Sequence, residues 1–343
     1  MATYRAPSPK TLARIALGKR RIINILRRHT VANMRTIEQK IADAGPTPQR
    51  VEPIHLTTAL KELIDTGQVK STLAGGSQTT RWYYLTAASQ QDVDSRLHRL
   101  LGVWRDFNKR DNALRRGQTL EIAIYRALCA QDHFDFQGEF TDLNDHDDTM
   151  LYTKTEPPSH LSGRRAPGHL DFLLCAPDRT WLGVEAKNIR EWLYPDRNEI
   201  RHFLAKCCAL RVVPVLIARR IPYVAFSEVF KPCGIIVHQT YNQLLPGSDQ
   251  DLATRAGHKD LLGYHDIRTG NAPDSRLNRF LHENLPQLVQ GARDRFFEHI
   301  DILEEFAHDL QYSEFIAKLK GAWNDPDTLT DEDWRAIWED LGY

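Results

Sequence analysis

Long hydrophobic runs are absent from this chain of 343 residues. No apolar run approaches the roughly 20 residues that a membrane-spanning helix needs, so no such helix is expected. The first residues, MATYRAPSPKTLARIALGKRR, carry positive charge but lack an apolar core and a small-residue cleavage site. They do not have the pattern of a secretory signal, and a cytoplasmic location is the default expectation.

Cysteine is scarce as well, and several catalytic motifs are missing. The five cysteines lie in or beside apolar runs, and no two of them form a C-x-x-C pair. We expect reduced, buried thiols rather than a zinc site or disulfides. The chain has no phosphate-binding P-loop, no G-x-S-x-G turn and no zinc-ligand spacing. These absences argue against P-loop nucleotide hydrolysis, serine-hydrolase chemistry and zinc enzymes.

The chain has no net charge, but its charges are unevenly distributed. Residues 1–90 contain 14 Lys and Arg against 5 Asp and Glu, whereas residues 241–343 contain 10 against 20. Residues 91–240 are nearly balanced, at 21 against 20. A chain that is basic at one end and acidic at the other can approach a polyanion in only some orientations. The basic end is where we expect nucleic acid to bind.

The hydrophobic pattern of the basic part predicts three helices and then a β-hairpin. The helices are expected in LGKRRIINILRRH, NMRTIEQKIADAG and IHLTTALKELIDTG, and the strands in QVKSTL and TTRWYYLT. Gly67 is expected to end the third helix in a left-handed conformation. This order, over residues 12–87, resembles the winged helix-turn-helix family, in which the third helix usually enters the major groove of DNA.

The winged-helix resemblance implies particular DNA contacts. Thr57, Thr58 and Lys61 would point outward from the third helix. Arg20, Arg21, Arg27 and Arg28 would contact phosphates, which positions a protein on DNA without reading its sequence. A solvated basic helix, or a winged helix used for protein contacts, remains an alternative.

Beyond the winged helix, the pattern divides the chain into three further parts. Residues 91–112 read as a helical connector that docks on the next part. Residues 113–240 alternate helices with short apolar strands in the order α-β-β-β-α-β-α-β, so an α/β domain with a covered sheet is expected. Its first strand is expected in DFQGEF, and a long polar stretch follows, with Arg164 and Arg165 in a loop. A later helix in RNEIRHFLAKCCAL leads to the apolar strand VVPVLIA. Residues 241–343 are acidic and mostly helical, with a last helix that Thr330 would cap.

The segment GHLDFLLCAPDRTWLGVEAKN holds the residues with the clearest chemical use. Asp171 is expected in one strand, and Glu185 and Lys187 in the next strand of the same hairpin. Because side chains two apart on a strand share a face, Glu185 and Lys187 would point the same way. Two carboxylates suit Mg²⁺, and a nearby ammonium can orient a water or stabilise negative charge. A solvent-exposed ion pair at a strand end is the structural alternative.

This arrangement resembles the PD-(D/E)xK nuclease superfamily over residues 113–240. The resemblance implies a restriction-endonuclease-like core whose catalytic and metal-binding residues are Asp171, Glu185 and Lys187, with Glu121 from the preceding helix. It also implies that the Ala186 carbonyl is a ligand of Mg²⁺ or Mn²⁺. The sequence departs from the family pattern in having Gly168-His169-Leu170, and no proline, before Asp171.

The expected function is therefore a metal-dependent DNA endonuclease, with restriction or defence against phage as its favoured setting. Arg164 and Arg165 would clamp the phosphate beside the scissile bond, and Arg201, His202 and Lys206 would face the DNA backbone. Cutting both strands would require two sites, which favours a homodimer. Two alternatives stay open: a DNA-binding regulator that has lost turnover, and a nuclease subunit directed by a protein partner through residues 241–343.

Overall fold

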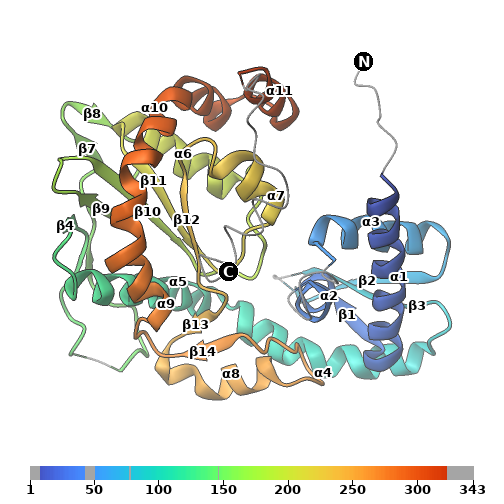
Figure 1. Ribbon diagram of the computed structural model, residues 1–343. Coiled ribbons are helices and arrows are strands. Elements are labelled where there is room, and N and C mark those ends of the chain that lie inside the picture. The colour runs from blue at the N-terminus through green and yellow to red at the C-terminus, as the bar shows by residue number, and fades with distance from the viewer. Residues whose placement is uncertain (1–7, 43–50, 77–78, 146, 323–343) are drawn as a thin grey trace. The chain divides into compact units, whose positions relative to one another are not determined.

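The computed structural model describes residues 8–42, 51–76, 79–145 and 147–322, and shows a mixed α/β protein (Figure 1). The chain forms two compact units. The first unit comprises residues 1–119, 146–151 and 242–271, and the second comprises 120–145, 152–241 and 272–343. In the ranges that the structure describes, no helix is long and apolar enough to cross a membrane. The predicted helix capped by Thr330 lies outside these ranges.

The first unit begins with the three predicted helices and the predicted hairpin. Its elements are α1 (Pro9–His29), β1 (Val31–Asn33), α2 (Met34–Ile41), α3 (Pro53–Asp65), β2 (Val69–Ala74), β3 (Thr80–Leu85), α4 (Gln90–Asn108), β13 (Gln243–Leu245), η4 (Gly247–Asp249), α8 (Gln250–Gly257) and β14 (Ile267–Thr269). A further helix, α5 (Arg110–Cys129), begins in this unit and ends in the second.

Local sequence explains why α1 forms and where it packs. The Ser8 hydroxyl accepts a hydrogen bond from the Thr11 amide, which caps the helix, and Pro9 follows at the first helical position. Ile22 and Leu26 are buried on one face. Gly18 lets α3 approach closely, because a Cβ there would lie 3.2 Å from the Ala59 Cβ.

The predicted hairpin is present, and a third strand joins it. The strand order is β1-β3-β2, with both pairs antiparallel. Strand β1 has only three residues and was not predicted, because its short VAN segment lies between two helical patterns. Gly67 has a φ of +69° after α3, which confirms the predicted left-handed helix end.

The sequence-based boundary at residue 241 does not match the compact units. Residues 242–271 belong with the first unit, because Leu245, Leu252 and Tyr264 share a hydrophobic core with Trp82 and with helix α4. The apolar face of α4, including Trp104 and Phe107, is buried in that same core. The predicted docking of this connector on the 113–240 part is therefore replaced by packing within the first unit.

The second unit contains a sheet of five strands. Its elements after α5 are β4 (Asp135–Gln137), β5 (Glu139–Phe140), β6 (Lys154–Thr155), β7 (His160–Leu161), β8 (Arg164–Arg165), β9 (Phe172–Cys175), β10 (Trp181–Lys187), α6 (Asn198–Leu210), β11 (Val213–Ala218), α7 (Tyr223–Ala225), the π-helical η3 (Phe226–Phe230), β12 (Ile236–Gln239), α9 (Ser275–Arg279), the π-helical η5 (Phe280–Asn284), α10 (Leu285–His308) and α11 (Tyr312–Ala322).

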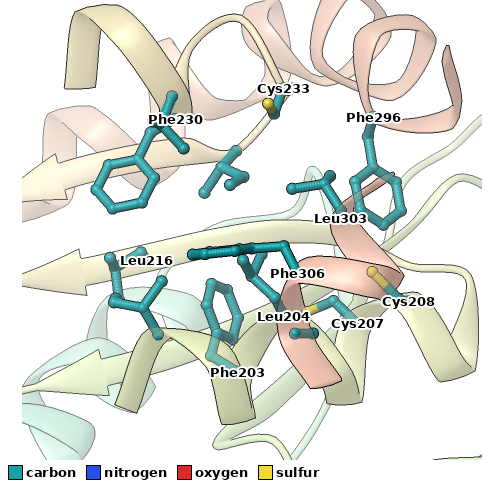
Figure 2. Packing of buried hydrophobic residues seen from close by; sticks show 14 of the residues in the cluster. Phe203, Leu204, Cys207, Cys208, Leu216, Phe230, Cys233, Phe296, Leu303 and Phe306 are labelled. Carbon is teal, nitrogen blue, oxygen red and sulfur yellow. The ribbon is translucent and has the colours of Figure 1, made fainter. Parts of the chain in front are cut away.

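The five strands have the order β12-β11-β10-β9-β4. Strand β10 is antiparallel to β9 and parallel to β11, and β12 continues the parallel part. Every residue of β11 and of the edge strand β12 is buried, as expected for strands covered on both faces. Helices α6 and α10 pack against each other and against β11. Figure 2 shows Phe203, Leu216 and Phe306 within the resulting core.

Two further sequence expectations need correction. The predicted single strand DFQGEF is divided into β4 and β5 at Gly138, which has a φ of +109°. The following polar stretch was expected to be loop, but it contains three short strands, β6, β7 and β8. The cysteine prediction holds in part: all five thiols are free and three are buried, but Cys175 is half-buried and Cys129 is exposed.

Candidate active site

The β9–β10 hairpin brings Asp171 beside Glu185. Val184 pairs with Phe172 across the two strands, and the Asp171 amide donates to the Val184 carbonyl at 3.0 Å. The Asp171 carboxylate in turn accepts a hydrogen bond from the Ala186 amide, with 2.7 Å between Oδ2 and N. Asp171 lies immediately before β9 and not within it, so the predicted position in the strand is corrected by one residue.

Glu185 and Lys187 lie on β10, as predicted, and their side chains contact each other. The Lys187 Nζ is 2.7 Å from Glu185 Oε1. The other carboxylate oxygen, Oε2, lies 2.5 Å from the Nζ of Lys206 on α6. The Glu185 side chain is only 7% exposed, and two ammonium groups therefore compensate its charge.

Glu121 reaches the same site from α5 through a shared lysine. The Lys154 Nζ lies 2.7 Å from Glu121 Oε2 and 3.7 Å from Asp171 Oδ1. It also lies 3.4 Å from the carboxylate of Glu156, whose side chain is about half exposed. A chain of contacts thus links Glu121, Lys154 and Asp171, and the Asp171–Ala186 hydrogen bond extends it to β10.

Short strands place Lys154 at this point. Strand β6 pairs with β5 so that Lys154 lies opposite Phe140. Gly138, before β5, lies against the site, because a Cβ there would be 2.8 Å from the Asp171 carbonyl oxygen. The Lys154 ammonium also sits 5.0 Å from the centre of the Phe172 ring. The bend at Gly138 and the β5–β6 pairing therefore position a buried cation between two acids.

The charges of the site perturb one another. Burial and the nearby Glu121 and Glu185 carboxylates together raise the pKa of the Asp171 carboxyl from 3.8 to about 7, because they outweigh the lowering effects of Lys154 and the Ala186 amide. Burial alone would lower the pKa of the Lys187 ammonium, but Glu185, together with Asp171 and Glu121, outweighs burial and raises that pKa. Lys187 therefore stays protonated at neutral pH.

Lys154 and the role of Lys206 were not foreseen from the sequence. Lys154 stands in a polar stretch with no periodic pattern, and only the β5–β6 pairing brings it to the carboxylates. Lys206 was expected to face a DNA backbone, but its ammonium contacts Glu185. Arg201, predicted for the same role, donates to the carbonyl oxygens of Phe306 and Leu310.

The residues predicted to contact DNA are mostly exposed. Thr57, Thr58 and Lys61 face outward from α3, as expected from the spacing of its buried residues. The two threonine hydroxyls donate to carbonyl oxygens one turn earlier in their own helix. Arg20, Arg27 and Arg28 are exposed on α1, and Arg21 is half-buried. Arg164 and Arg165 are exposed on β8.

Among the residues that the structure describes, no three His, Cys, Asp or Glu side chains are grouped as they would be around a metal ion. The carboxylates of Glu121, Asp171 and Glu185 each form an ion pair with at least one lysine. Repulsion from Glu121 and Glu185 contributes to the raised pKa of Asp171.

Comparison of the chain with family models, curated proteins and solved structures found no match.

Proposed function

We propose that this protein is a metal-dependent nuclease that hydrolyses phosphodiester bonds in DNA, with Glu121, Asp171, Glu185 and Lys187 at its centre. The observation that carries the proposal is the electrostatic coupling of three acids from α5, the start of β9 and β10: burial and repulsion from Glu121 and Glu185 raise the pKa of Asp171 to about 7. The order of the helix, hairpin, helix and parallel strand supports the resemblance to the PD-(D/E)xK core.

The donor set suits a hard divalent cation. Mg²⁺ and Mn²⁺ prefer carboxylate oxygens, and Glu121, Asp171 and Glu185 would hold the ion together with the Ala186 carbonyl. When bound, such an ion supplies charge neutralisation at the phosphate and a more acidic water. It would also relieve the repulsion that raises the pKa of Asp171.

Lys187 has an electrostatic role in this proposal. Its ammonium is protonated at neutral pH, because the Glu185 carboxylate raises its pKa. A protonated lysine cannot take a proton from water, but it can orient the water and stabilise negative charge that develops on the phosphate. Glu185, 2.7 Å away, holds the ammonium in place.

The first unit would recruit the substrate. Three helices and a sheet in the order β1-β3-β2 support a winged helix in residues 8–85. The exposed face of α3, with Thr57, Thr58 and Lys61, would enter the major groove. The arginines of α1 would contact phosphates and supply the salt-dependent part of the affinity.

A specific observation favours a second candidate function, that of a DNA-binding regulator without turnover. Lys154 and Lys206 neutralise the proposed ligands Glu121 and Glu185 at contact distance. A site that has lost its metal would keep its acids folded by pairing them with lysines in this way. In that case DNA binding would be insensitive to chelators.

The test is incubation of the full-length protein with supercoiled plasmid in Mg²⁺, in Mn²⁺ or in a chelator, beside Asp171→Asn, Lys187→Met and Glu156→Gln. Glu156 is the matched control, because it also borders Lys154 but lies outside the proposed centre. We expect metal-dependent nicking or linearisation by the wild type and the control only. Equal cleavage by Asp171→Asn would contradict the assigned centre. Chelator-insensitive binding without cleavage would favour the second function.

A further inference from the structure

The first unit contains a basic pocket whose lining residues, apart from Arg28, have no part in the proposed nuclease. Its volume is about 400 Å³. The walls come from three segments far apart in the sequence: the end of α1, the end of α2 and the turn that follows α8. Pockets of this size are typical of small-molecule sites.

Three cationic side chains line this pocket, one from each segment: Arg28, Lys40 and Lys259. Lys40 is half-buried, and its ammonium donates to the Lys259 carbonyl oxygen at 3.2 Å. Gly263 makes room for that ammonium, because a Cβ there would lie only 2.7 Å from the Lys40 Nζ. Gly263 also has a φ of +71°, a backbone conformation that residues other than glycine rarely adopt.

The cations of the pocket are not paired with carboxylates of the described residues. In the ranges that the structure describes, no carboxylate forms an ion pair with any of the three cations Arg28, Lys40 and Lys259. Burial lowers the pKa of Lys40. The positive charges of Arg28 and Arg96 lower this pKa further, and together they outweigh Asp260, which raises it. The positive charges of this pocket therefore repel one another, and a bound anion would offset the free energy that this repulsion costs.

The remaining walls suit the uncharged part of a ligand. His29 forms a buried part of the pocket lining, and burial together with the nearby Lys40 lowers its pKa to about 4, so its ring is neutral at physiological pH. Ile25 and His265 also line the pocket. A planar or apolar group can lie on such a surface while anionic oxygens face the cations.

We propose that this pocket binds a small phosphorylated molecule, of the nucleoside di- or triphosphate class, through Arg28, Lys40 and Lys259. Three lining cations, together with Arg96, which donates to the carbonyl oxygen of His29, match a ligand carrying several negative charges better than a monoester. The arginine fork and two lysines are the groups that proteins commonly use for phosphate oxygens. The inference does not rest on the nuclease centre, since none of its residues belongs to that site.

The experiment is calorimetric titration of the full-length protein at low salt, without added metal, using ADP, ATP and inorganic pyrophosphate. The variants are Lys40→Met and Arg28→Gln, and the matched control is Arg105→Gln, which removes an exposed arginine from α4 outside the pocket. We expect at least one of the three compounds to bind the wild type. Each pocket variant should weaken that binding about tenfold or more, and the control should not change it.

Thermal melting of each variant separates binding from folding. Arg28 is exposed, so Arg28→Gln is expected to melt like the wild type and remains informative even if Lys40→Met is unstable. The proposal is overturned if none of the three compounds binds, or if the folded Arg28→Gln protein binds them as tightly as the wild type. It is also overturned if both pocket variants weaken only the binding of duplex DNA, since the phosphates recognised would then be those of the DNA backbone.

Discussion

Asp171 is an acid whose surroundings work against its charge. Its pKa is raised to about 7 because burial and two neighbouring carboxylates outweigh Lys154 and the Ala186 amide. When the pKa of an acid is higher in the folded than in the unfolded state, ionising the acid destabilises the fold. The protein is therefore less stable at neutral and higher pH than it would be with this acid protonated. A side chain whose ionised form lowers stability in this way is typical of functional sites.

Asp171→Asn is therefore expected to leave the free energy of unfolding unchanged or to raise it, while removing activity. The asparagine oxygen can still accept the hydrogen bond from the Ala186 amide, and the repulsion with Glu121 and Glu185 disappears. Urea denaturation at pH 7.5 measures the change. Asp178, in the turn of the same hairpin, is the control: hydrogen bonds from Thr180 lower its pKa, so Asp178→Asn should lower stability. A clear loss of stability in Asp171→Asn would contradict the repulsive environment.

At this scale the sequence predicted the acids but not their counter-ions. Glu185 and Lys187 were placed correctly because alternation along one strand is a local property. Lys154 was missed because its position depends on pairing between two strands of two residues each. Strands this short leave no periodic pattern in a sequence.

At the scale of elements, Gly138 joins the edge of the main sheet to the small β5–β6 hairpin. Its φ of +109° turns the chain, and its bare Cα lets the backbone approach the start of β9. The predicted continuous strand DFQGEF fails here because a positive φ cannot continue a regular strand.

Gly138→Ala should consequently destabilise the protein by about 2–4 kcal/mol and reduce cleavage by displacing Asp171, because overpacking and a positive φ each cost energy. A Cβ would lie 2.8 Å from the Asp171 carbonyl oxygen and 2.9 Å from the Phe172 ring. Gly163→Ala is the matched control: its φ is +77° but no atom lies within 4 Å of the added carbon. Chemical denaturation of both variants gives the comparison. Equal losses would mean that backbone conformation, and not the close approach, sets the cost.

Strand β12 carries a buried histidine that links stability to pH. His238 stacks on Phe280 with ring centroids 4.5 Å apart, and neither ring nitrogen has a hydrogen-bond partner among the described residues. Burial, with the charges of Arg276 and Arg279, lowers its pKa from 6.5 to about 3. Between these pH values His238 therefore binds a proton in the unfolded chain but not in the folded chain.

His238 should thus lower stability progressively as the pH falls below about 6.5, by about 2 kcal/mol at pH 5, and have no such effect at pH 7.5. His238→Phe keeps a ring on Phe280 and removes this dependence. Urea denaturation at pH 7.5 and 5 tests it, with the exposed His160→Gln as control. The stability gap between His238→Phe and wild type should widen on acidification. A constant gap would show that His238 is protonated in the folded state.

On the scale of the whole molecule, the sequence located most elements but not their grouping. The apolar strand β11 and helix α6 were found because each carries a continuous local pattern. The grouping of residues 242–271 with the first unit was missed. It depends on contacts between β13, β14 and α8 and an α4 core more than 130 residues earlier in the chain, which no local pattern records.

The uneven charge distribution predicts salt-dependent binding of duplex DNA through the basic first unit. We expect the logarithm of the affinity to fall linearly with the logarithm of salt concentration. Arg20→Gln, Arg21→Gln and Arg27→Gln should each reduce the slope by about one, because each would remove one phosphate contact. Fluorescence anisotropy in the presence of a chelator measures the slopes, with Arg105→Gln as control. Slopes unaffected by all three substitutions would place the DNA elsewhere.

The central claim is that Glu121, Asp171 and Glu185 together hold one divalent cation. Titration of Mn²⁺ into the full-length protein, followed by the electron paramagnetic resonance signal of free Mn²⁺, tests it without knowledge of the DNA substrate. We predict that the wild type and the control Glu156→Gln bind Mn²⁺, whereas Asp171→Asn and Glu121→Gln lose that binding. Mn²⁺ binding that is absent in the wild type, or unchanged in Asp171→Asn, would contradict the account.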